Sequence, residues 1–391
     1  MTSEWGTIRA ADFIDFNPRL SLKKGDIATK VAMDKLKPFT KKIPETEKAE
    51  FNGGAKFCNG DTVMARITPC LENGKTAYVD MLDDGEIGFG STEFIVMRAK
   101  AGISDPQFVY YTAINPVFRN VAIKSMVGSS GRQRVQQSVL EELELSVPDL
   151  DEQRHIGAFL ARLDEKIALN NRINDNLQQQ LFSLYENMAM TSPCLKEYTL
   201  SNLCDFQEGY VNPPQTHPEY FDGEVKWLRA VDINESFIIE TSRTLTKAGF
   251  ESAKKSALLF EPSTIAISKS GTIGRLGIIA DYMCGNRAVI NIAPHDTNML
   301  AFIYCFLKSK QREFPDMAVG SVQKNLYVSL LEPLSVSVPD NESLTAFNAV
   351  GASILGMIHN NCVENKNLTN LRDTILPKLM SGAIDVSAVK L

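Results

Sequence analysis

The sequence predicts an α+β protein in which two similar, β-rich domains are joined by two long antiparallel helices. Three observations lead to this fold class. The chain repeats itself at a spacing of 191 residues, from Ser146 to Ser337. Each half begins with short β-branched segments between Gly, Asp and Asn turns, and each half ends in one long amphipathic stretch. The element order is therefore globule, helix, globule, helix, with an internal pseudo-twofold repeat.

The repeat is clearest at the phrase Ser-Val-Pro-Asp, which begins at Ser146 and again at Ser337. Upstream of it, GSSGRQRV from Gly128 corresponds to GSVQKNLY from Gly320 with a shift of one residue. The chain is therefore expected to divide into two globular and two helical segments, which alternate as 1–148, 149–192, 193–339 and 340–391.

Composition limits the classes of protein that need to be considered. With 391 residues, 44% apolar and 23% charged, the chain has the composition of an ordinary globular protein with room for two domains. A net charge of −6 argues against a protein that is basic all over. The seven cysteines are scattered without a Cys-x-x-Cys pair, and no segment has the apolar length of a signal peptide core or a membrane span. These features predict a cytoplasmic protein that neither spans nor crosses a membrane.

Heptad spacing marks the two predicted helices. In the first, steps of four and three residues place two asparagines, Asn170 and Asn174, in a stripe with Ile156, Leu160, Leu163, Ile167, Leu177, Leu181 and Leu184. Adding 191 gives a second stripe, in which Asn361 and Asn365 accompany Phe347, Gly351, Ile354, Ile358, Leu368, Arg372 and Ile375. A buried asparagine is satisfied opposite a matching partner, so antiparallel pairing would let these four side chains meet and fix the helix register.

Local signals place the ends of these helices. Asp149 and Asp340 follow prolines and are suited to cap the first turns. Pro377 is expected to end the second helix. The first helix, over 151–187, would be about 55 Å long at 1.5 Å per residue. That length favours a rod between two domains over the alternative, an amphipathic helix that packs only on its own domain.

The layout resembles the specificity subunit of Type I restriction–modification systems across nearly the whole chain. The resemblance rests on the boundary phrase LSVPDLDEQRHIGAFLARLDEKI, its return as VSVPDNESLTAFNAV, and the two Gly-Ser loops. It implies that residues 1–148 and 193–339 are target-recognition domains, each recognising one half of a bipartite DNA sequence. It also implies that the helices set the unread gap and dock methyltransferase subunits. The second copy has DNESL in place of DEQRH, so its helix contacts are expected to differ.

The same resemblance supplies the expected partners and cofactors. The partners would be double-stranded DNA, methyltransferase (modification) subunits and motor-nuclease (restriction) subunits. S-adenosylmethionine, ATP and Mg²⁺ would be used by those subunits, while this chain is expected to hold no cofactor, metal or catalytic residue. The residues agree: VNPPQ from Val211 ends in Gln where a methyltransferase loop needs an aromatic ring, and the phosphate-loop-like Gly74-Lys75-Thr76 lacks its earlier glycine.

Basic and amide side chains give the candidate DNA contacts. Between Arg19 and Lys48 there are nine Lys or Arg against four acidic residues, which predicts a surface for phosphates or a solvated loop. The Gly-Ser loops carry donors and acceptors suited to base edges. The candidate residues are Lys41, Lys42, Arg66, Arg132, Gln133, Arg134, Lys269, Arg275, Gln323, Lys324 and Asn325.

Two other functions remain open on the sequence. A stand-alone DNA methyltransferase or nuclease would act without partners, and the missing cofactor fingerprints argue against it. A coiled-coil scaffold would join proteins without DNA, and the paired polar loops argue against that class.

Overall fold

The structure is a computed structural model that describes residues 5–192, 195–321 and 323–385. Its contacts divide the chain into two compact units, unit 1 with residues 1–168 and 367–391, and unit 2 with residues 169–366. Each unit contains one β-rich domain and a part of both long helices. The unit boundaries therefore run through the helices, whereas the sequence placed its segment boundaries at helix ends; the expected boundary at 193 lies outside the described residues.

Unit 1 is built on two four-stranded sheets; the central pair of strands is antiparallel in the first sheet and parallel in the second. The first sheet has the order β2 (Ile14–Phe16), β9 (Phe94–Ala99), β6 (Thr62–Ala65), β7 (Thr76–Tyr78). The second has the order β4 (Glu47–Glu50), β3 (Ile27–Val31), β8 (Gly88–Gly90), β5 (Ala55–Phe57). The remaining elements are β1 (Gly6–Arg9), which pairs with β10 (Glu144–Val147), and the helices α1 (Ala10–Phe13), α2 (Pro106–Ile114), α3 (Pro116–Lys124) and α4 (Gln137–Glu141).

Unit 2 repeats this plan with variations. Its main sheet has the order β12 (Cys204–Glu208), β19 (Val289–Pro294), β16 (Ile265–Ser268), β17 (Leu276–Ile279), β14 (Phe237–Ile238). A second sheet has the order β15 (Thr244–Leu245), β13 (Phe221–Leu228), β18 (Cys284–Gly285), and β11 (Leu195–Thr199) pairs with β20 (Ser335–Pro339). The helices of the domain are α6 (Lys247–Glu251), α7 (Leu300–Lys310), α8 (Phe314–Met317) and α9 (Val328–Leu331).

The core of each domain lies where a short buried strand meets a buried helix. Every residue of β6 and of β16 is buried, as expected for the middle strand of a sheet that is covered on both faces. The helix α2 begins at Pro106, and the carboxylate of Asp105 accepts a hydrogen bond from the Phe108 N–H at 3.0 Å. In unit 2, α7 takes the corresponding place after β19. The predicted α+β fold with a doubled β-rich domain is confirmed.

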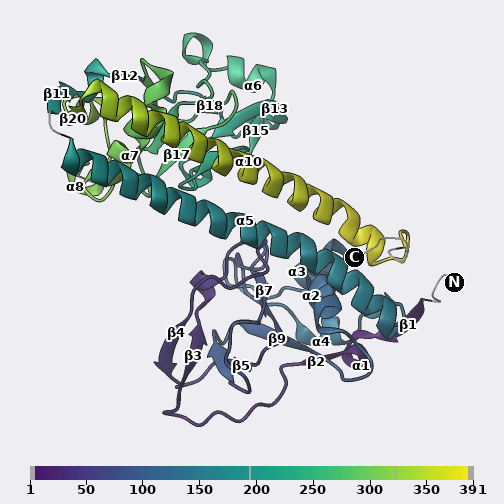
Figure 1. Cartoon of the computed structure of the whole chain (residues 1–391). Helices are drawn as coiled ribbons and strands as arrows, with labels where there is room; N and C mark the ends of the chain where they lie inside the picture. The colour runs from purple at the N-terminus through teal and green to yellow at the C-terminus, as the bar shows by residue number, and fades with distance from the viewer. Residues whose placement is uncertain (1–4, 193–194, 322, 386–391) are drawn as a thin grey trace. The chain divides into compact units, whose positions relative to one another are not determined.

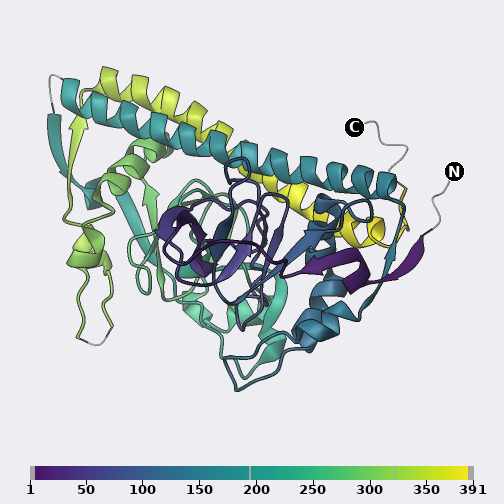
Figure 2. The ribbon, with the colours of Figure 1, turned by 90° about the horizontal axis from the view of Figure 1, so that it is seen from below.

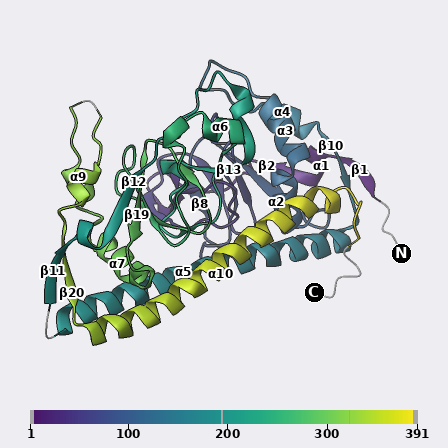
Figure 3. The ribbon, with the colours of Figure 1, turned by 90° about the horizontal axis from the view of Figure 1, so that it is seen from above.

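The two long helices are α5 (Leu150–Thr191) and α10 (Asn341–Leu379), and within each unit a part of one lies beside a part of the other (Figures 1, 2 and 3). Both predicted caps are present: Asp149 accepts from the Glu152 N–H at 2.9 Å, and Asp340 from the Ser343 N–H at 3.0 Å. In the parts of the chain that the structure describes, no helix is both long and apolar enough to cross a bilayer.

The prediction that Pro377 ends the second helix is wrong. The helix α10 continues past Pro377 to Leu379. A proline removes one backbone donor, but in the last turn few hydrogen bonds remain to be lost. The flanking Leu376 and Leu379 are both buried in the core of unit 1, and this packing outweighs the local cost of the proline.

Candidate nucleic-acid interface

Two equivalent hairpin loops stand at the corresponding place in the two units. Loop 1 (residues 128–133) is closed by paired main-chain bonds between Val127 and Arg134, at 3.0 and 2.9 Å. Loop 2 (residues 320–324) is closed in the same way between Val319 and Asn325, again at 3.0 and 2.9 Å. Arg134 and Asn325 are 191 positions apart, so the one-residue shift seen in the sequence falls inside the loop.

Both loops begin with a glycine that the backbone requires. Gly128 and Gly320 have φ angles of +136° and +140°, which side chains rarely adopt. A Cβ at Gly128 would lie 2.9 Å from the carbonyl oxygen of Arg132, and one at Gly320 would lie 2.2 Å from that of Gln323. The glycines therefore let each hairpin fold back tightly on itself.

The loops are anchored to the central strand of each domain. The Val135 N–H bonds the carbonyl of Arg66 at 2.9 Å, and the Leu326 N–H bonds the carbonyl of Lys269, also at 2.9 Å. Arg66 directly follows β6 and Lys269 directly follows β16, so a basic residue lies at the root of each hairpin. In Figure 3, loop 2 extends from α9 as a narrow hairpin.

The loop side chains differ in their access to solvent. Arg132, Arg134, Gln323 and Lys324 are exposed, whereas Gln133 and Asn325 are half-buried. The Asn325 amide donates to the carbonyl of Gln323 at 3.1 Å. The structure thus brings both predicted loop triplets to the surface at equivalent sites, each with donors and acceptors suited to base edges.

A carboxylate that the sequence reasoning missed accompanies the basic residues of each root. Glu93 accepts bonds from Arg134 Nε at 2.9 Å and Nη2 at 2.6 Å, and its Oε2 lies 3.9 Å from Arg66 Nε. The hydrogen bonds from Arg134 lower the pKa of Glu93 below its ordinary value. No spacing rule connects residues 41 positions apart, so only the folded chain shows this pair.

In unit 2 a carboxylate from a different strand, Glu208 at the end of β12, lies at the root of loop 2. It accepts from Lys269 Nζ at 2.7 Å, and the same ammonium lies 4.8 Å from the centre of the Tyr327 ring. Burial alone would raise the pKa of Glu208, but the bonds from Lys269 and Tyr210 lower it overall. Arg275 is half-buried in the turn after β16, where its N–H bonds Ser268 Oγ at 2.8 Å.

Lys41 does not belong to this surface, although the sequence placed it among the candidates. Its side chain is 5% exposed, and its ammonium donates to Gln107 and, at 3.2 Å, to the Tyr111 hydroxyl. The same ammonium lies within 5.4 Å of the ring centres of Tyr78, Tyr110 and Tyr111, and burial lowers the pKa of Lys41 to about 8. A lysine enclosed in this way is not accessible to a phosphate on the surface.

Several other cations of the predicted basic run are paired within the domain. Lys42 pairs with Asp80, Lys30 with Glu47 at 2.7 Å, and Lys48 with Glu86 at 2.7 Å. Much of the local excess of positive charge is therefore neutralised near β3 and β4. Three cations line a cavity of about 590 Å³ in unit 1, next to Glu93: Arg19, Lys56 and Arg66.

The predicted asparagines meet within unit 2, near one end of its part of the helix pair. Asn170 is fully buried, and its amide donates to Asn365 Oδ1 at 2.9 Å and to Glu364 Oε2 at 2.7 Å. The Asn361 amide donates to Asn174 Oδ1 at 2.8 Å. As the residue number rises on α5 it falls on α10, so the helices are antiparallel here. Glu364 was not predicted, because it lies outside the heptad stripe.

The helix pair of unit 1 uses a different polar contact at its seam. Arg372 and Asp164, which are 5% and 6% exposed, form an ion pair at 2.6 Å. The Tyr111 hydroxyl donates to the other oxygen of Asp164 at 2.6 Å. The positions 191 residues away in unit 2 are occupied by leucines, Leu355 and Leu181, and both are buried. The repeat therefore conserves the place of this contact and changes its chemistry.

Comparison with known proteins agrees with the doubled architecture. The family described as the Type I restriction modification DNA specificity domain matches residues 3–179 and again residues 195–370. The chain belongs to this family. Each match covers one β-rich domain together with a part of the helix that follows it.

Individual members of the Type I specificity family resemble the chain over most of its length. The HindI specificity subunit of Haemophilus influenzae is 23% identical and is aligned over 83% of this chain and 86% of its own. The MjaIX specificity subunit of Methanocaldococcus jannaschii is also 23% identical, over 68% of this chain and 66% of its own. A solved Type I S subunit from M. genitalium has the same fold, with a TM-score of 0.54, 18% identity and 96% of each chain covered.

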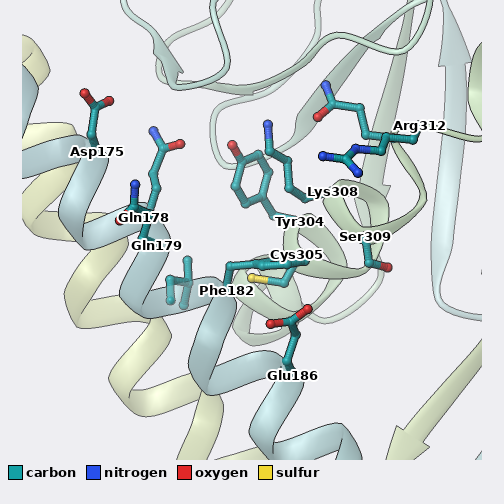
Figure 4. A pocket seen from close by; sticks show the side chains of 12 residues that line it. Asp175, Gln178, Gln179, Phe182, Glu186, Tyr304, Cys305, Lys308, Ser309 and Arg312 are labelled. Carbon is teal, nitrogen blue, oxygen red and sulfur yellow. The ribbon is translucent and has the colours of Figure 1, made fainter.

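Unit 2 also contains a cavity between α5 and α7. It has a volume of about 780 Å³ (Figure 4). The figure shows side chains of both charge signs around it, with Asp175 and Glu186 on α5 and Lys308 and Arg312 on or just after α7. Lys308 pairs with Glu235.

Proposed function

We propose that this chain is the DNA-recognition subunit of a Type I restriction–modification complex, in which each β-rich domain recognises one half of a bipartite, asymmetric duplex target. The observation that carries the proposal is the pair of equivalent hairpin loops. They have the same main-chain anchors but different side chains, with Arg132, Gln133 and Arg134 in loop 1 and Gln323, Lys324 and Asn325 in loop 2. Equal placement with unequal chemistry suits two half-sites of different sequence.

The side chains of the loops are those that bind bases in the major groove. Arginine can donate two hydrogen bonds to the O6 and N7 of guanine, and asparagine or glutamine can bond the N6 and N7 of adenine. The cations that line the unit 1 cavity would bind the nearby phosphates and orient the domain. The chain as a whole carries a charge of −6, so binding depends on this local positive surface.

The helix pair is proposed to set the unread gap between the half-sites. Its register is supported by the buried contacts Asn170–Asn365 and Asn174–Asn361, which determine the residue of α5 that lies opposite each residue of α10. A slip by one turn would separate every one of these amide pairs. A fixed register gives the fixed gap length that a bipartite target requires.

Partner subunits are proposed to dock on the outer face of the helices. On α5, Leu169 and Ile173 are exposed, and so is Leu184, which the heptad spacing had wrongly placed in the buried stripe; on α10, Val350 and Met357 are exposed. Methyltransferase subunits would bind there with S-adenosylmethionine, and motor-nuclease subunits would bring ATP and Mg²⁺, so that this chain recognises DNA and its partners carry the chemistry. A complex that acts on chromosomal DNA would place the chain in the cytoplasm.

Methylome sequencing tests the proposal. Cells that carry this chain with its methyltransferase should show adenine methylation at one bipartite motif. The double variant Arg132→Ala with Arg134→Ala should relax one half of that motif, and Lys324→Ala with Asn325→Ala should relax the other half. Variants that relax the same half would contradict the assignment of one domain to one half-site. Methylation by the purified chain alone would show that it is an enzyme, and unchanged DNA binding by both variants would favour a scaffold.

A further inference from the structure

The backbone of Arg134 is held firmly at the base of loop 1. Its N–H and carbonyl pair with Val127, it also forms a bridge with Ile67 beyond the end of β6, and the next residue, Val135, is buried in the core. An arginine on such a backbone starts from a fixed Cα position, so only its side-chain torsions remain to be ordered when it binds a ligand.

Glu93 orders those torsions in advance. Its carboxylate binds the Nε and Nη2 edge of the Arg134 guanidinium with two nearly parallel bonds, at 2.9 and 2.6 Å. Glu93 is itself held in place, because its N–H bonds Ser91 Oγ at 3.1 Å and its carbonyl accepts from the Arg66 N–H at 2.9 Å. The Glu93 side chain is 23% exposed and that of Arg134 is 45% exposed, so the carboxylate lies inward and the guanidinium outward.

A guanidinium has five N–H donors in one plane, and the carboxylate occupies one edge of it. Within the described part of the chain, no partner takes the Nη1 donors, so the outer Nη1 and Nη2 edge of Arg134 faces solvent. The geometry of that edge matches the two acceptors of guanine, O6 and N7, in the major groove.

A carboxylate beside a DNA-binding loop is costly unless it has a use. Its charge repels phosphates, and an ion pair as exposed as this one contributes little to stability. The cations Arg19, Lys56 and Arg66 line the adjoining cavity, so a negative group here reduces the attraction that they provide. This weaker attraction for phosphates has a physical reason if the Glu93 carboxylate fixes the direction of the Arg134 guanidinium.

We propose that Glu93 is a positioning residue that presents Arg134 to a single guanine in the half-site recognised by residues 1–148. The inference rests on the proposed function and adds to it the base and the residue that selects it. At the equivalent position of unit 2, Asn325 bonds within its own loop and has no such carboxylate. The guanine contact is therefore specific to the first half-site.

Binding of the assembled complex to synthetic duplexes tests this inference. Each guanine of the first half-site is replaced in turn by 7-deazaguanine, which lacks the N7 acceptor. The complex with the unaltered chain should lose affinity at one position by at most roughly 150-fold, the upper end of the range for a complete bidentate base contact, because 7-deazaguanine removes one of its two bonds. Arg134→Lys should abolish this discrimination while keeping the charge. Glu93→Gln should reduce it several-fold without lowering the salt slope of binding.

Glu208→Gln is the control, since it removes the charge of a carboxylate that pairs with Lys269 at the root of loop 2 and should leave the first half-site unaffected. Thermal melting of each variant establishes that it folds. Retained discrimination in Glu93→Gln, or equal weakening of all sequences in Arg134→Ala with a salt slope lower by about one, would overturn the inference. The proposed function would survive that result if the loop 1 double variant still relaxed its half-site. It would fail as well if no variant of either loop altered recognition.

Discussion

The amide pair Asn174–Asn361 offers a sharp test of the helix register. Asn174 is 5% exposed, its Oδ1 accepts from Asn361 Nδ2 at 2.8 Å, and its own amide lies 3.6 Å from Cys362 Sγ. Asn174→Leu removes the acceptor and leaves the Asn361 amide unpaired, which costs about 1–3 kcal/mol. For a unit of the size of residues 169–366, we expect the melting temperature to fall by about 2–4 °C for each kcal/mol.

Replacement of both partners should behave differently. When Asn174→Leu is combined with Asn361→Leu, no polar group is left unpaired, and the loss should be much smaller than for the single variant. Asn176→Leu is the control, because Asn176 is exposed on the same helix, and its effect should stay within about 0.5 kcal/mol.

Hydrogen exchange of peptides from α10 is the suitable assay, since a chain with two units need not unfold in a single step. The single variant should speed exchange around Asn361, and the paired variant should restore most of the protection. Two results would show that the amide contact has no role in stability. The first is exchange around Asn361 that is no faster in Asn174→Leu than in Asn176→Leu. The second is a loss of stability in the paired variant that exceeds the sum of the losses in the two single variants.

Three further perturbations address other parts of the molecule. Arg372→Leu leaves the carboxylate of Asp164 buried without its cation and should destabilise unit 1 by about 3–5 kcal/mol. The double variant Asp164→Leu with Arg372→Leu should recover more than half of this loss, as measured by chemical denaturation. Hydrogen bonds, of which that from Lys48 is the largest cause, lower the pKa of Glu86 from 4.5 to about 2. The ionised carboxylate therefore contributes its full stabilisation above pH 4.5, and this contribution is lost as the pH falls through 2. In an acid titration, the difference in stability between Glu86→Gln and the unaltered chain should shrink over that range. Arg19→Ala, at one of the cations proposed to bind phosphates, should weaken binding to all DNA sequences and lower the salt slope by about one, as measured by titration at several salt concentrations.

The fold could be predicted because its signals are local or repeated. The caps Asp149 and Asp340 act on N–H groups three residues away, and the heptad stripe lies within a single helix. The repeat doubled the weight of each signal, since a chance pattern would not recur 191 residues later. Even the meeting of Asn174 with Asn361 follows from the stripe once the helices are taken as antiparallel.

The residues that escaped prediction depend on tertiary contacts. Lys41 looked like its neighbours in a basic run, yet its ammonium is enclosed by three tyrosine rings from distant segments. Glu93 gave no signal at all, because its importance comes from Arg134, which lies 41 residues further along the chain. A count of charges records how many cations a segment has, but it does not record which of them face inward.

The way in which the loops are anchored explains how one architecture can serve two different half-sites. Each hairpin is closed and tied to its central strand by main-chain hydrogen bonds, and these do not depend on the side chains that the loop carries. The backbone of each hairpin needs a positive φ angle at its first residue, and Gly128 and Gly320 adopt that angle. Arg134 and Asn325 can therefore differ at the same position without a change in the path of the chain. On the proposed function, selectivity for bases then depends on the side chains of each loop and on their local supports, such as Glu93.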